Sequence, residues 1–596
     1  MANGFGSLYV GASGLQSAQN GLNVIANNLS NVDTEGYVRQ QVIFEDRTYL
    51  DTKLRASVSK QQTGLGVAIG DVIHARDQFL DRAYRTENGR QAFYAANFEA
   101  ATEVETLLNE SNGSLGASFA TAISDFYDAF SEFSKSPADP VNLNLIAQKA
   151  DLFLTRAQGV YDGLTTYQKN INTKIRDDID RINELGKTIY DLNWRIQQVE
   201  AGGVETAMNL RDARDQALDE LSHLANISYS ETYDGIVKVK LEGTDFVIES
   251  RAYEIGMKED MITGFVMPYW DQLSDPRNGD YYRVFDVYNA DPTRNTDIGE
   301  VKALLLIRGD EYADYMDIDG MSDYAYEKTI AKSIMLNTEA ELDTMAHDMI
   351  LAINDLLSPT VEFGDSQIAK SLGQESISVK DAFGNDLTIT KDMKIFNEQI
   401  ACVGNDGQMP PRELFTRVGC ERYTSYYYTD PNTNEKYTIY VYNEEDPKDP
   451  STCYTLLSTN VNAEIAEDPS LIAHRHANNG PTWMTDDIAY DLGADIYALW
   501  ESSDYTLNPS DKTPCGFAEF YAKLVGELAD TGSVYRTTSE SLTNTKATIE
   551  SNRQAVVGVS SDEELTNMIK FQNAYNASSR YMTVISEMIE TLLNTA

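Results

Sequence analysis

The chain is poor in positive charge and has no long apolar run. Of its 596 residues only 48 are Lys or Arg, whereas 93 are Asp or Glu, so the formal net charge is −45. Such an acidic surface repels phosphate backbones and anionic lipid headgroups, and we therefore expect no nucleic-acid partner. No stretch reaches the roughly 18 apolar residues that a membrane-spanning helix needs, so we expect no membrane insertion.

The N-terminus lacks the features of a cleaved secretory signal. Residues Met1 to Val32 contain no charge, the first acid is Asp33, and the first base is Arg39. A secretory signal begins with basic residues and continues with a compact apolar block. Export of this chain from the cell must therefore use a route that removes no such signal.

Cysteine and histidine are scarce. Of five histidines only His474 and His476 lie close together. On a strand they would face one side and could bind a metal with Glu467 or Asp468, but we favour a solvated loop. The motifs of zinc proteases, serine hydrolases and P-loop enzymes are absent, so we predict a non-enzymatic protein without catalytic residues, metal or cofactor. Irregular spacing favours unpaired, partly buried thiols over disulfides for the four cysteines, which are Cys402, Cys420, Cys453 and Cys515.

The N-terminal segment carries an apolar stripe in heptad spacing. Its other residues are Gly, Asn, Ser and Gln, which are weak helix formers, so this helix needs a partner. Small residues such as Gly14 and Gly21 would let backbones approach closely. One row is Leu8, Leu15, Leu22 and Leu29, and the companion row is Gly11, Ala18, Ile25 and Val32. We predict that Leu8, Leu15, Leu22, Ile25, Leu29 and Val32 form an N-terminal assembly seam.

The C-terminal segment carries a matching stripe, with Ser561 as the expected N-cap before three acids. Two amphipathic termini either pack on each other or are offered to neighbouring subunits. Two ordinary bundle helices fit the heptads equally well. One row is Met568, Tyr575, Met582 and Ile589, and the other is Phe571, Ser578, Ile585 and Leu592. We predict a C-terminal assembly seam of Met568, Phe571, Tyr575, Met582, Ile585, Ile589 and Leu592.

Long helices alternate with two strand-rich regions in the interior. The strand signals lie between Asn226 and Ile307 and between Pro359 and Pro509. In the second region Tyr423, Tyr426, Tyr427 and Tyr428 either mark a carbohydrate or protein contact or, as we favour, belong to a half-buried sheet. Helices are predicted at 78–108, 118–133, 142–161, 164–199, 210–224, 324–357 and 517–554, with the fourth ending near Gly202 and Gly203.

The resulting fold class is a multidomain α+β protein with a terminal α-helical coiled coil, an elongated helical-bundle domain and β-rich outer domains. Residues 1–60 with 556–596 form the terminal assembly domain, and 61–226 with 308–357 and 511–555 form the helical domain. Residues 227–307 form a small β-rich domain or subdomain. Residues 358–510 form a β-rich, variable, inserted outer domain.

The segment from Ala26 to Tyr37 resembles the terminal signature of the flagellar rod, hook and hook-associated proteins. In that family Ala-Asn-Asn-Leu/Ile-Ala-Asn is followed by Asn-Thr-Pro-Gly-Tyr. Here Asp33 and Glu35 replace the Asn and the Pro, so the turn loses its stiffest residue. Val38-Arg39-Gln40 looks like the Ser-Arg-Gln that follows. The residues that carry the match are Asn27, Asn28, Thr34, Gly36 and Tyr37.

Further blocks resemble the hook-associated members of this family. They are Asn209–Ser222, Ile298–Leu305, Gly558–Leu565 and Phe571–Tyr575. These blocks frame residues 1 to about 357 and 511–596, whereas the 359–509 insert is not covered.

The resemblance implies a structural protein of the bacterial flagellum that polymerises in a helical ring at the hook tip, outside the cell. It implies export by the flagellar type III apparatus with a cytoplasmic chaperone. The implied partners are the hook protein, a second junction protein and, indirectly, flagellin. The alternative is an axial scaffold whose 359–509 insert carries an adhesin or an enzymatic activity.

Overall fold

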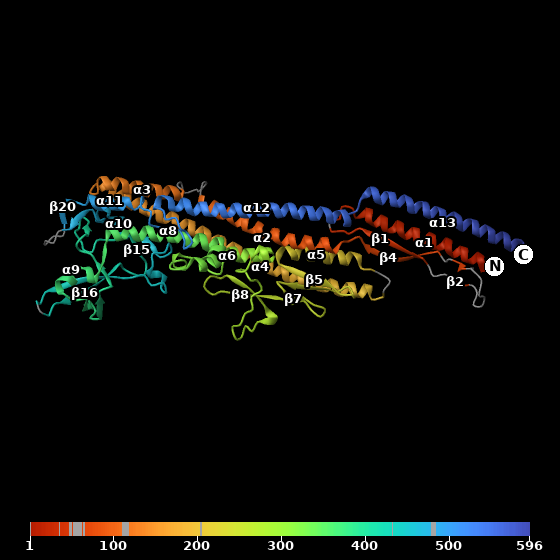
Figure 1. The fold of residues 1–596 in the computed structure, drawn as a ribbon, viewed down its shortest axis with the longest axis horizontal. Helices are drawn as coiled ribbons and strands as arrows, with labels where there is room; N and C mark the ends of the chain where they lie inside the picture. Colours follow the sequence, from red (N-terminus) through yellow and green to blue (C-terminus); the bar gives the residue numbers. More distant parts are fainter. Residues whose placement is uncertain are drawn as a thin grey trace.

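The computed structural model describes residues 2–34, 36–46, 50–51, 62–63, 66–109, 118–202, 206–431, 433–477 and 484–595. Glu35 and Gly203 lie outside these residues. The molecule is a long rod with both termini at one end (Figure 1). The strands of the 358–510 segment lie at the opposite end. No helix of the described residues is long and apolar enough to cross a membrane.

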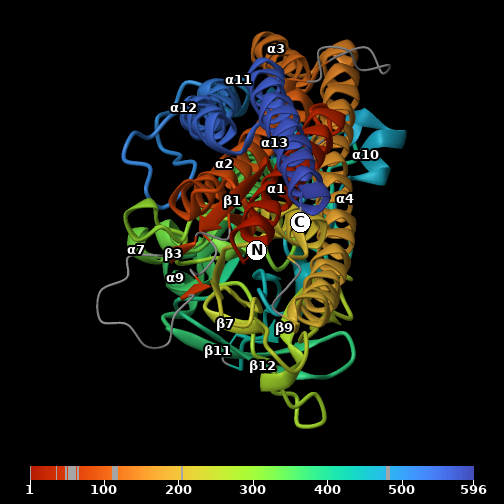
Figure 2. The ribbon, with the colours of Figure 1, turned by 90° about the vertical axis from the view of Figure 1, so that its right-hand side faces the viewer.

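Two terminal helices, α1 (Ala2–Ser30) and α13 (Ser561–Thr595), form the narrow end. Beside them lies a two-stranded sheet of β1 (Gln40–Asp46) and β4 (Val67–His74). A second short pair joins β2 (Leu50–Asp51) to β3 (Gln62–Thr63). The end-on view shows α1 and α13 in front of the rod helices (Figure 2).

The rod consists of helices that run along its axis. They are α2 (Gln78–Asn109), α3 (Phe119–Lys135), α4 (Pro140–Glu200), α5 (Met208–Leu224), α6 (Glu300–Arg308), α8 (Ile334–Leu357) and α12 (Phe517–Val557). The two helices predicted at 142–161 and 164–199 are one helix of 61 residues, α4, because the intervening residues continue its buried face at Leu164. Asp139 caps it by accepting a hydrogen bond from the Val141 N–H at 2.9 Å.

The helix predicted at 324–357 is interrupted. It begins as α7 (Asp323–Lys328), continues as a short 3-10 turn at Ile330–Lys332, and restarts as α8. The Ser333 hydroxyl accepts from the Leu336 N–H at 3.3 Å, so this serine caps α8 and ends the preceding turn.

A strand-rich layer covers one side of α4. It consists of β5 (Ile227–Glu231), β6 (Val237–Leu241) and β7 (Thr244–Val247), followed by the hairpin of β8 (Ile255–Glu259) and β9 (Val266–Trp270). The prediction of strands between Asn226 and Ile307 is confirmed, and in β6 Val237, Val239 and Leu241 are buried whereas the intervening lysines are more exposed.

Three asparagines of α4 hold this layer in place. They are spaced by about three helical turns and therefore share one face. Each amide donates to a backbone carbonyl and accepts from a backbone N–H, as a neighbouring strand would. Asn172 bonds Gly264 O and Val266 N, Asn183 bonds both groups of Ile255, and Asn193 bonds both groups of Val237, all at 2.8–3.0 Å.

The outer end contains a six-stranded sheet in the order β10-β13-β17-β16-β11-β12. These strands are Thr360–Glu362, Lys394–Phe396, Lys436–Tyr442, Tyr423–Thr429, Ser376–Asp381 and Asp386–Thr390. The half-buried strand predicted for the tyrosine cluster is confirmed as β16, in which Tyr428 is buried and Tyr427 is exposed.

The remaining strands and short helices of this end pack beside that sheet. They are α9 (Gln367–Leu372), β14 (Cys402–Val403), β15 (Phe415–Arg417), β18 (Thr459–Val461), α10 (Ala463–Glu467), β19 (Arg475–Ala477), β20 (Met484–Ile488) and α11 (Tyr490–Ala498). All four cysteines are free thiols, and all but Cys420 are buried.

The hydrophobic core runs through most of the rod. One cluster extends from Phe93 to Leu528 and includes both the strands beside α4 and residues such as Phe415 and Trp500 of the 358–510 segment. A separate cluster lies behind the six-stranded sheet. One part of the 358–510 segment thus shares its core with the rod, and another part has its own core. The division of the chain into four domains stays a prediction.

Candidate assembly site at the terminal helices

The two terminal helices pack antiparallel along most of their length. Of the two arrangements left open by the sequence, the structure shows the one in which the terminal helices pack on each other. Glycine makes the close approach possible, because a Cβ at Gly11 would lie 2.7 Å from Met582 Sδ, and one at Gly21 would lie 2.9 Å from Phe571 Cε1. A Cβ at Gly14 would similarly lie 2.8 Å from the hydroxyl of the facing serine of α13.

The predicted C-terminal seam lies mainly on the face of α13 that meets α1. Tyr575 is 38% exposed, and the side chain of Leu592 lies outside the described part of the chain. The remaining members are half-buried, namely Met568, Phe571, Met582, Ile585 and Ile589.

The two N-terminal rows differ in burial. Gly11, Ala18 and Ile25 are buried, whereas the leucine row at Leu8, Leu15, Leu22 and Leu29 is only half-buried. Val32 is a correction to the predicted seam, because α1 ends at Ser30 and Val32 lies in the following turn with 39% exposure. The turn starts where the Asn31 side chain donates to Asn27 O at 2.9 Å.

The turn after α1 is held by Asn28, which is buried. Its Oδ1 accepts from the Tyr37 hydroxyl at 2.8 Å and from the Gln40 N–H at 3.1 Å. Its Nδ2 donates to Gln40 O at 3.0 Å and to Glu564 Oε2 at 3.2 Å. Burial, together with nearby carboxylates, raises the pKa of Tyr37 to about 12, so the phenol stays protonated and remains a donor.

Arg39 connects this turn to the start of α13. Its guanidinium donates from Nε to Glu564 Oε1 at 2.8 Å and from Nη1 to Glu563 Oε2 at 3.0 Å. Its backbone N–H donates to Val557 O at 2.9 Å. The predicted N-cap is wrong by one residue, because Ser561 already belongs to α13 and it is the Ser560 hydroxyl that faces the Glu563 N–H at 3.5 Å.

A row of acids on α5 faces arginines from three other segments. Asp219 accepts from Arg85 Nε and from Arg553 Nη2, both at 2.6 Å. Asp215 pairs with Arg85 at 3.3 Å and also with Arg76. These pairs tie α2, α5, α12 and the residues after β4 into one unit.

The third acid of this row, Asp212, contacts a histidine instead of an arginine. His74 Nε2 lies 3.4 Å from Asp212 Oδ1. Burial lowers the pKa of His74 to about 4, and burial raises the pKa of Asp212 to about 7. We therefore regard this contact as an uncharged pair near pH 6 rather than an ion pair.

We call residues 31–39, 74–88, 208–222 and 553–564 the joint. A cleft of about 580 Å³ opens at the joint, between the turn after α1 and the residues that connect α12 to α13. The joint is where the terminal helix pair is attached to the rod.

Comparisons with known proteins find similar flagellar proteins. The family model described as the helical domain of the flagellar hook-associated protein FlgK matches residues 101–366. Models described as a flagella basal body rod protein and as the C-terminal part of the flagellar basal body rod FlgEFG proteins match residues 8–37 and 552–595. Hook-associated protein 1 of Bacillus subtilis is 23% identical over 613 aligned residues, covering 100% of this chain and 99% of the relative.

The chain is similar to flagellar hook-associated protein 1 over its whole length. The Escherichia coli protein is 22% identical over 98% of each chain. The flagellar hook junction protein FlgK from Burkholderia pseudomallei is a similar solved structure with a TM-score of 0.48 and 11% identity, and the match covers 80% of this chain and all of that one.

Most blocks that resemble hook-associated protein 1 meet in the joint. Tyr37 and Arg39 come from the first block, Asp212 to Asp219 from the second, and Glu563 and Glu564 from Gly558–Leu565. Gly36 has a positive φ of 75°, and a side chain there would overlap Gln216 of the second block. Of the other motif residues, Asn27 donates to Gln40 Oε1 at 3.3 Å, and Thr34 donates to Asn31 Oδ1 at 3.2 Å.

Sequence reasoning missed the cations of the joint. Arg76, Arg85 and Arg553 are far apart in the sequence and stand in no motif. The one available signal was the spacing of Asp212, Asp215 and Asp219, which places three acids on one face of α5.

The two histidines considered as metal ligands do not converge on one point. His474 Nδ1 lies 2.7 Å from Ile472 O, whereas His476 Nε2 lies 3.2 Å from Asp491 Oδ1. His474 is buried and lies outside β19, so the predicted solvated loop is wrong for this residue. Within the described ranges no group of three potential metal-ligating side chains is present.

Proposed function

We propose that this chain is a structural component of the bacterial flagellum, which polymerises at the hook tip and joins the hook to the filament. The full-length likeness to flagellar hook-associated protein 1 supports this function. Export through the flagellar type III apparatus with a chaperone is part of the proposal, and it rests on the family resemblance. The weak helix propensity of the N-terminal segment suits a chain that folds only after export.

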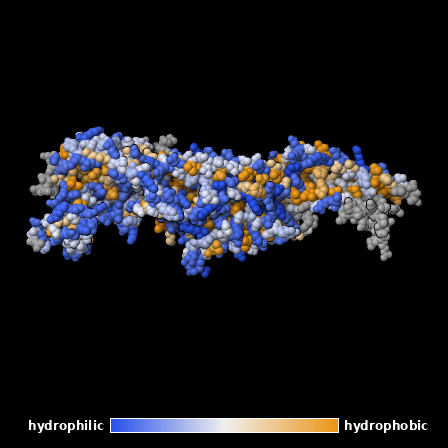
Figure 3. All heavy atoms as spheres, viewed as in Figure 1, coloured by the Kyte–Doolittle hydropathy of each residue, from blue (hydrophilic) through white to orange (hydrophobic). Residues whose placement is uncertain are grey.

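One observation carries the assembly role, namely a second apolar face on α13. This outer stripe consists of apolar side chains that α1 leaves 43–69% exposed, and its members are Leu565, Ile569, Val584, Met588 and Leu593. Hydrophobic residues gather visibly over the terminal helices (Figure 3). A pair of helices cannot bury two faces of one member, so we assign the outer stripe to neighbouring subunits.

Each part of the molecule then has its own task. Residues 1–60 with 556–596 would assemble with copies of the same chain and with the hook protein, the second junction protein and, indirectly, flagellin. The rod of 61–226, 308–357 and 511–555 would carry the outer units, 227–307 and 358–510, away from the assembled wall.

Deletion of the gene followed by complementation tests this function. The deletion strain should form hooks without filaments and lose flagellin to the medium, and the intact gene should restore filaments. A copy with Ile569→Ser, Val584→Ser and Met588→Ser should fail to restore them. The matched control carries Phe383→Ser, Ile400→Ser and Leu457→Ser, three exposed apolar residues of the outer region, and should restore filaments.

Two outcomes would contradict the proposal. Normal filaments in the deletion strain would refute the junction role. Full restoration by the outer-stripe variant would refute the assignment of α13, while leaving the junction role intact.

A further inference from the structure

Two glutamates of α8 are buried without a cation. Glu339 and Glu341 are 0% and 2% exposed, respectively, although glutamate is almost never fully buried unless it is paired. They lie two residues apart and therefore point to different sides of α8. Each one holds a different segment of the chain.

Glu339 holds the turn before the 3-10 helix at Tyr315–Asp317. Its Oε2 accepts from the Ala313 N–H at 3.0 Å and from Gln168 Nε2 at 3.3 Å. Its Oε1 is buried without a hydrogen-bond partner, and so is Oε1 of Gln168. The titratable groups that face it are Asp317 from the 3-10 helix, Tyr161 from α4 and Tyr312 from the turn, none of which supplies positive charge.

Glu341 holds the loop before α12. Its Oε1 accepts from Asn508 Nδ2 at 2.7 Å and from the Tyr326 hydroxyl at 3.3 Å. The same Asn508 nitrogen donates to Glu527 Oε2 at 3.2 Å, so one amide bridges carboxyl groups from α8 and α12. The Lys523 ammonium pairs with Asp511.

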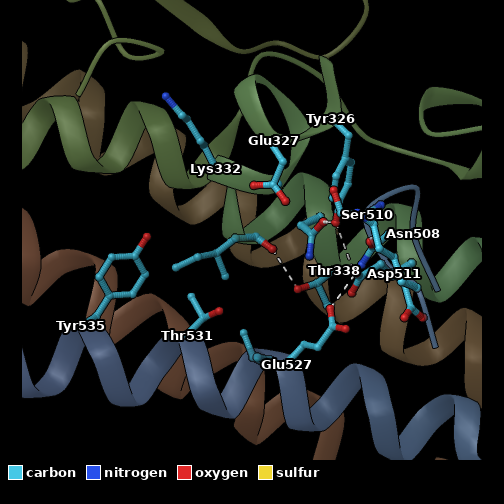
Figure 4. A pocket seen from close by; sticks show the side chains of 16 residues that line it. Tyr326, Glu327, Lys332, Thr338, Asn508, Ser510, Asp511, Glu527, Thr531 and Tyr535 are labelled. Atoms are coloured by element: carbon cyan, nitrogen blue, oxygen red, sulfur yellow. Dashed lines mark hydrogen bonds between the residues drawn. The ribbon is translucent and has the colours of Figure 1, made fainter. Parts of the chain in front are cut away.

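These groups surround a pocket of about 380 Å³ between α8 and α12, in which Asn508, Glu527 and Tyr326 point toward one another (Figure 4). The donors to both glutamates are uncharged. A carboxylate in such surroundings loses its hydration and gains no ion pair, and this favours the protonated form.

We propose that Glu339 and Glu341 are both protonated in the folded rod, and that these two protons fasten the Ala313 turn and the Asn508 loop to α8. A proton on either side chain removes the buried charge while the oxygen that accepts the hydrogen bonds keeps them. Loss of the proton places a carboxylate in the core and loosens the segment that the carboxyl group holds.

The direction of the pH dependence follows from linkage. Burial raises the pKa of both glutamates to about 8, with Glu527 adding to the effect at Glu341. A pKa that is higher in the folded state means that stability is fully present below the unfolded value and is lost as pH rises toward 8. Each carboxyl group should raise the unfolding equilibrium constant by up to about tenfold per pH unit in this window.

Denaturation of the full-length chain from about pH 5 to about pH 9 tests the proposal. The double variant Glu339→Gln, Glu341→Gln keeps an amide in place of each protonated carboxyl group. It should flatten the pH dependence and be more stable than the parent at about pH 8. The matched control, Glu103→Gln with Glu540→Gln, alters two exposed glutamates of α2 and α12 and should keep the parental slope.

Two results would overturn the proposal. One is a double variant that keeps the parental slope or is less stable than the parent at about pH 8. The second measurement is infrared spectroscopy: near pH 6 the carbonyl band of protonated carboxyl groups should be stronger in the parent than in the double variant, and the two are compared because Asp212 contributes to both. Absence of that difference near pH 6 would equally contradict the proposal.

Discussion

Single glycines set the distance between the terminal helices. At Gly21 a side chain would meet the Phe571 ring, so we expect Gly21→Val to force the helices apart and to cost about 1–3 kcal/mol through overpacking. Hydrogen exchange of the α1 amides measures this loss. The control is Gly526→Val in α12, where a Cβ meets open space, and it should leave the exchange of α1 unchanged.

The Arg39–Glu564 pair joins the turn after α1 to the start of α13. The Glu564 side chain is 3% exposed, so removal of its cation leaves a buried carboxylate. We expect Arg39→Met to cost about 3–5 kcal/mol, and clearly less in a Glu564→Gln background, since the amide carries no charge. A double-mutant cycle from denaturation measures the coupling, and additive losses would show that the pair is not coupled.

At the scale of elements, α4 organises the rod through its asparagines. Replacement of Asn183 by Leu leaves the N–H and the carbonyl of Ile255 without their partner, and we expect a cost of about 1–3 kcal/mol. The expected signature is faster hydrogen exchange in β8. Asn170→Leu on the exposed face of the same helix is the control, and an equal loss there would refute the role of the amide.

Element positions were largely predictable from the sequence. The helix predicted at 78–108 and the observed α2 at Gln78–Asn109 differ by one residue, because periodicity is strong in a long helix. The break before α8 was missed although serine is favoured at a helix start, because Ile330 and Ile334 continue the apolar helical spacing across Ser333. The asparagine contacts were missed because a side-chain amide does not reveal its partner strand in the sequence.

At the scale of the molecule, the charge of −45 opposes association between copies. Salt screens such repulsion, because the Debye length falls from about 10 Å at 0.1 M to about 3 Å at 1 M. We therefore expect self-association to rise with ionic strength, as measured by sedimentation velocity. Self-association of the outer-stripe variant should not increase with salt. If self-association of the parent weakens with salt, the assignment of the outer stripe to neighbouring subunits is contradicted.

The sequence alone determined that both termini are amphipathic helices, that the N-terminal one needs a partner, and which family the ends resemble. These properties depend on neighbours within a few residues, so spacing and composition reveal them. Only the tertiary structure decided that the glycine row rather than the leucine row is the buried one, that two acids of α5 meet arginines from distant segments, and that two glutamates lie in the core. Spacing shows which residues share a face, but the cost or gain of burying that face depends on groups that folding brings from far along the chain.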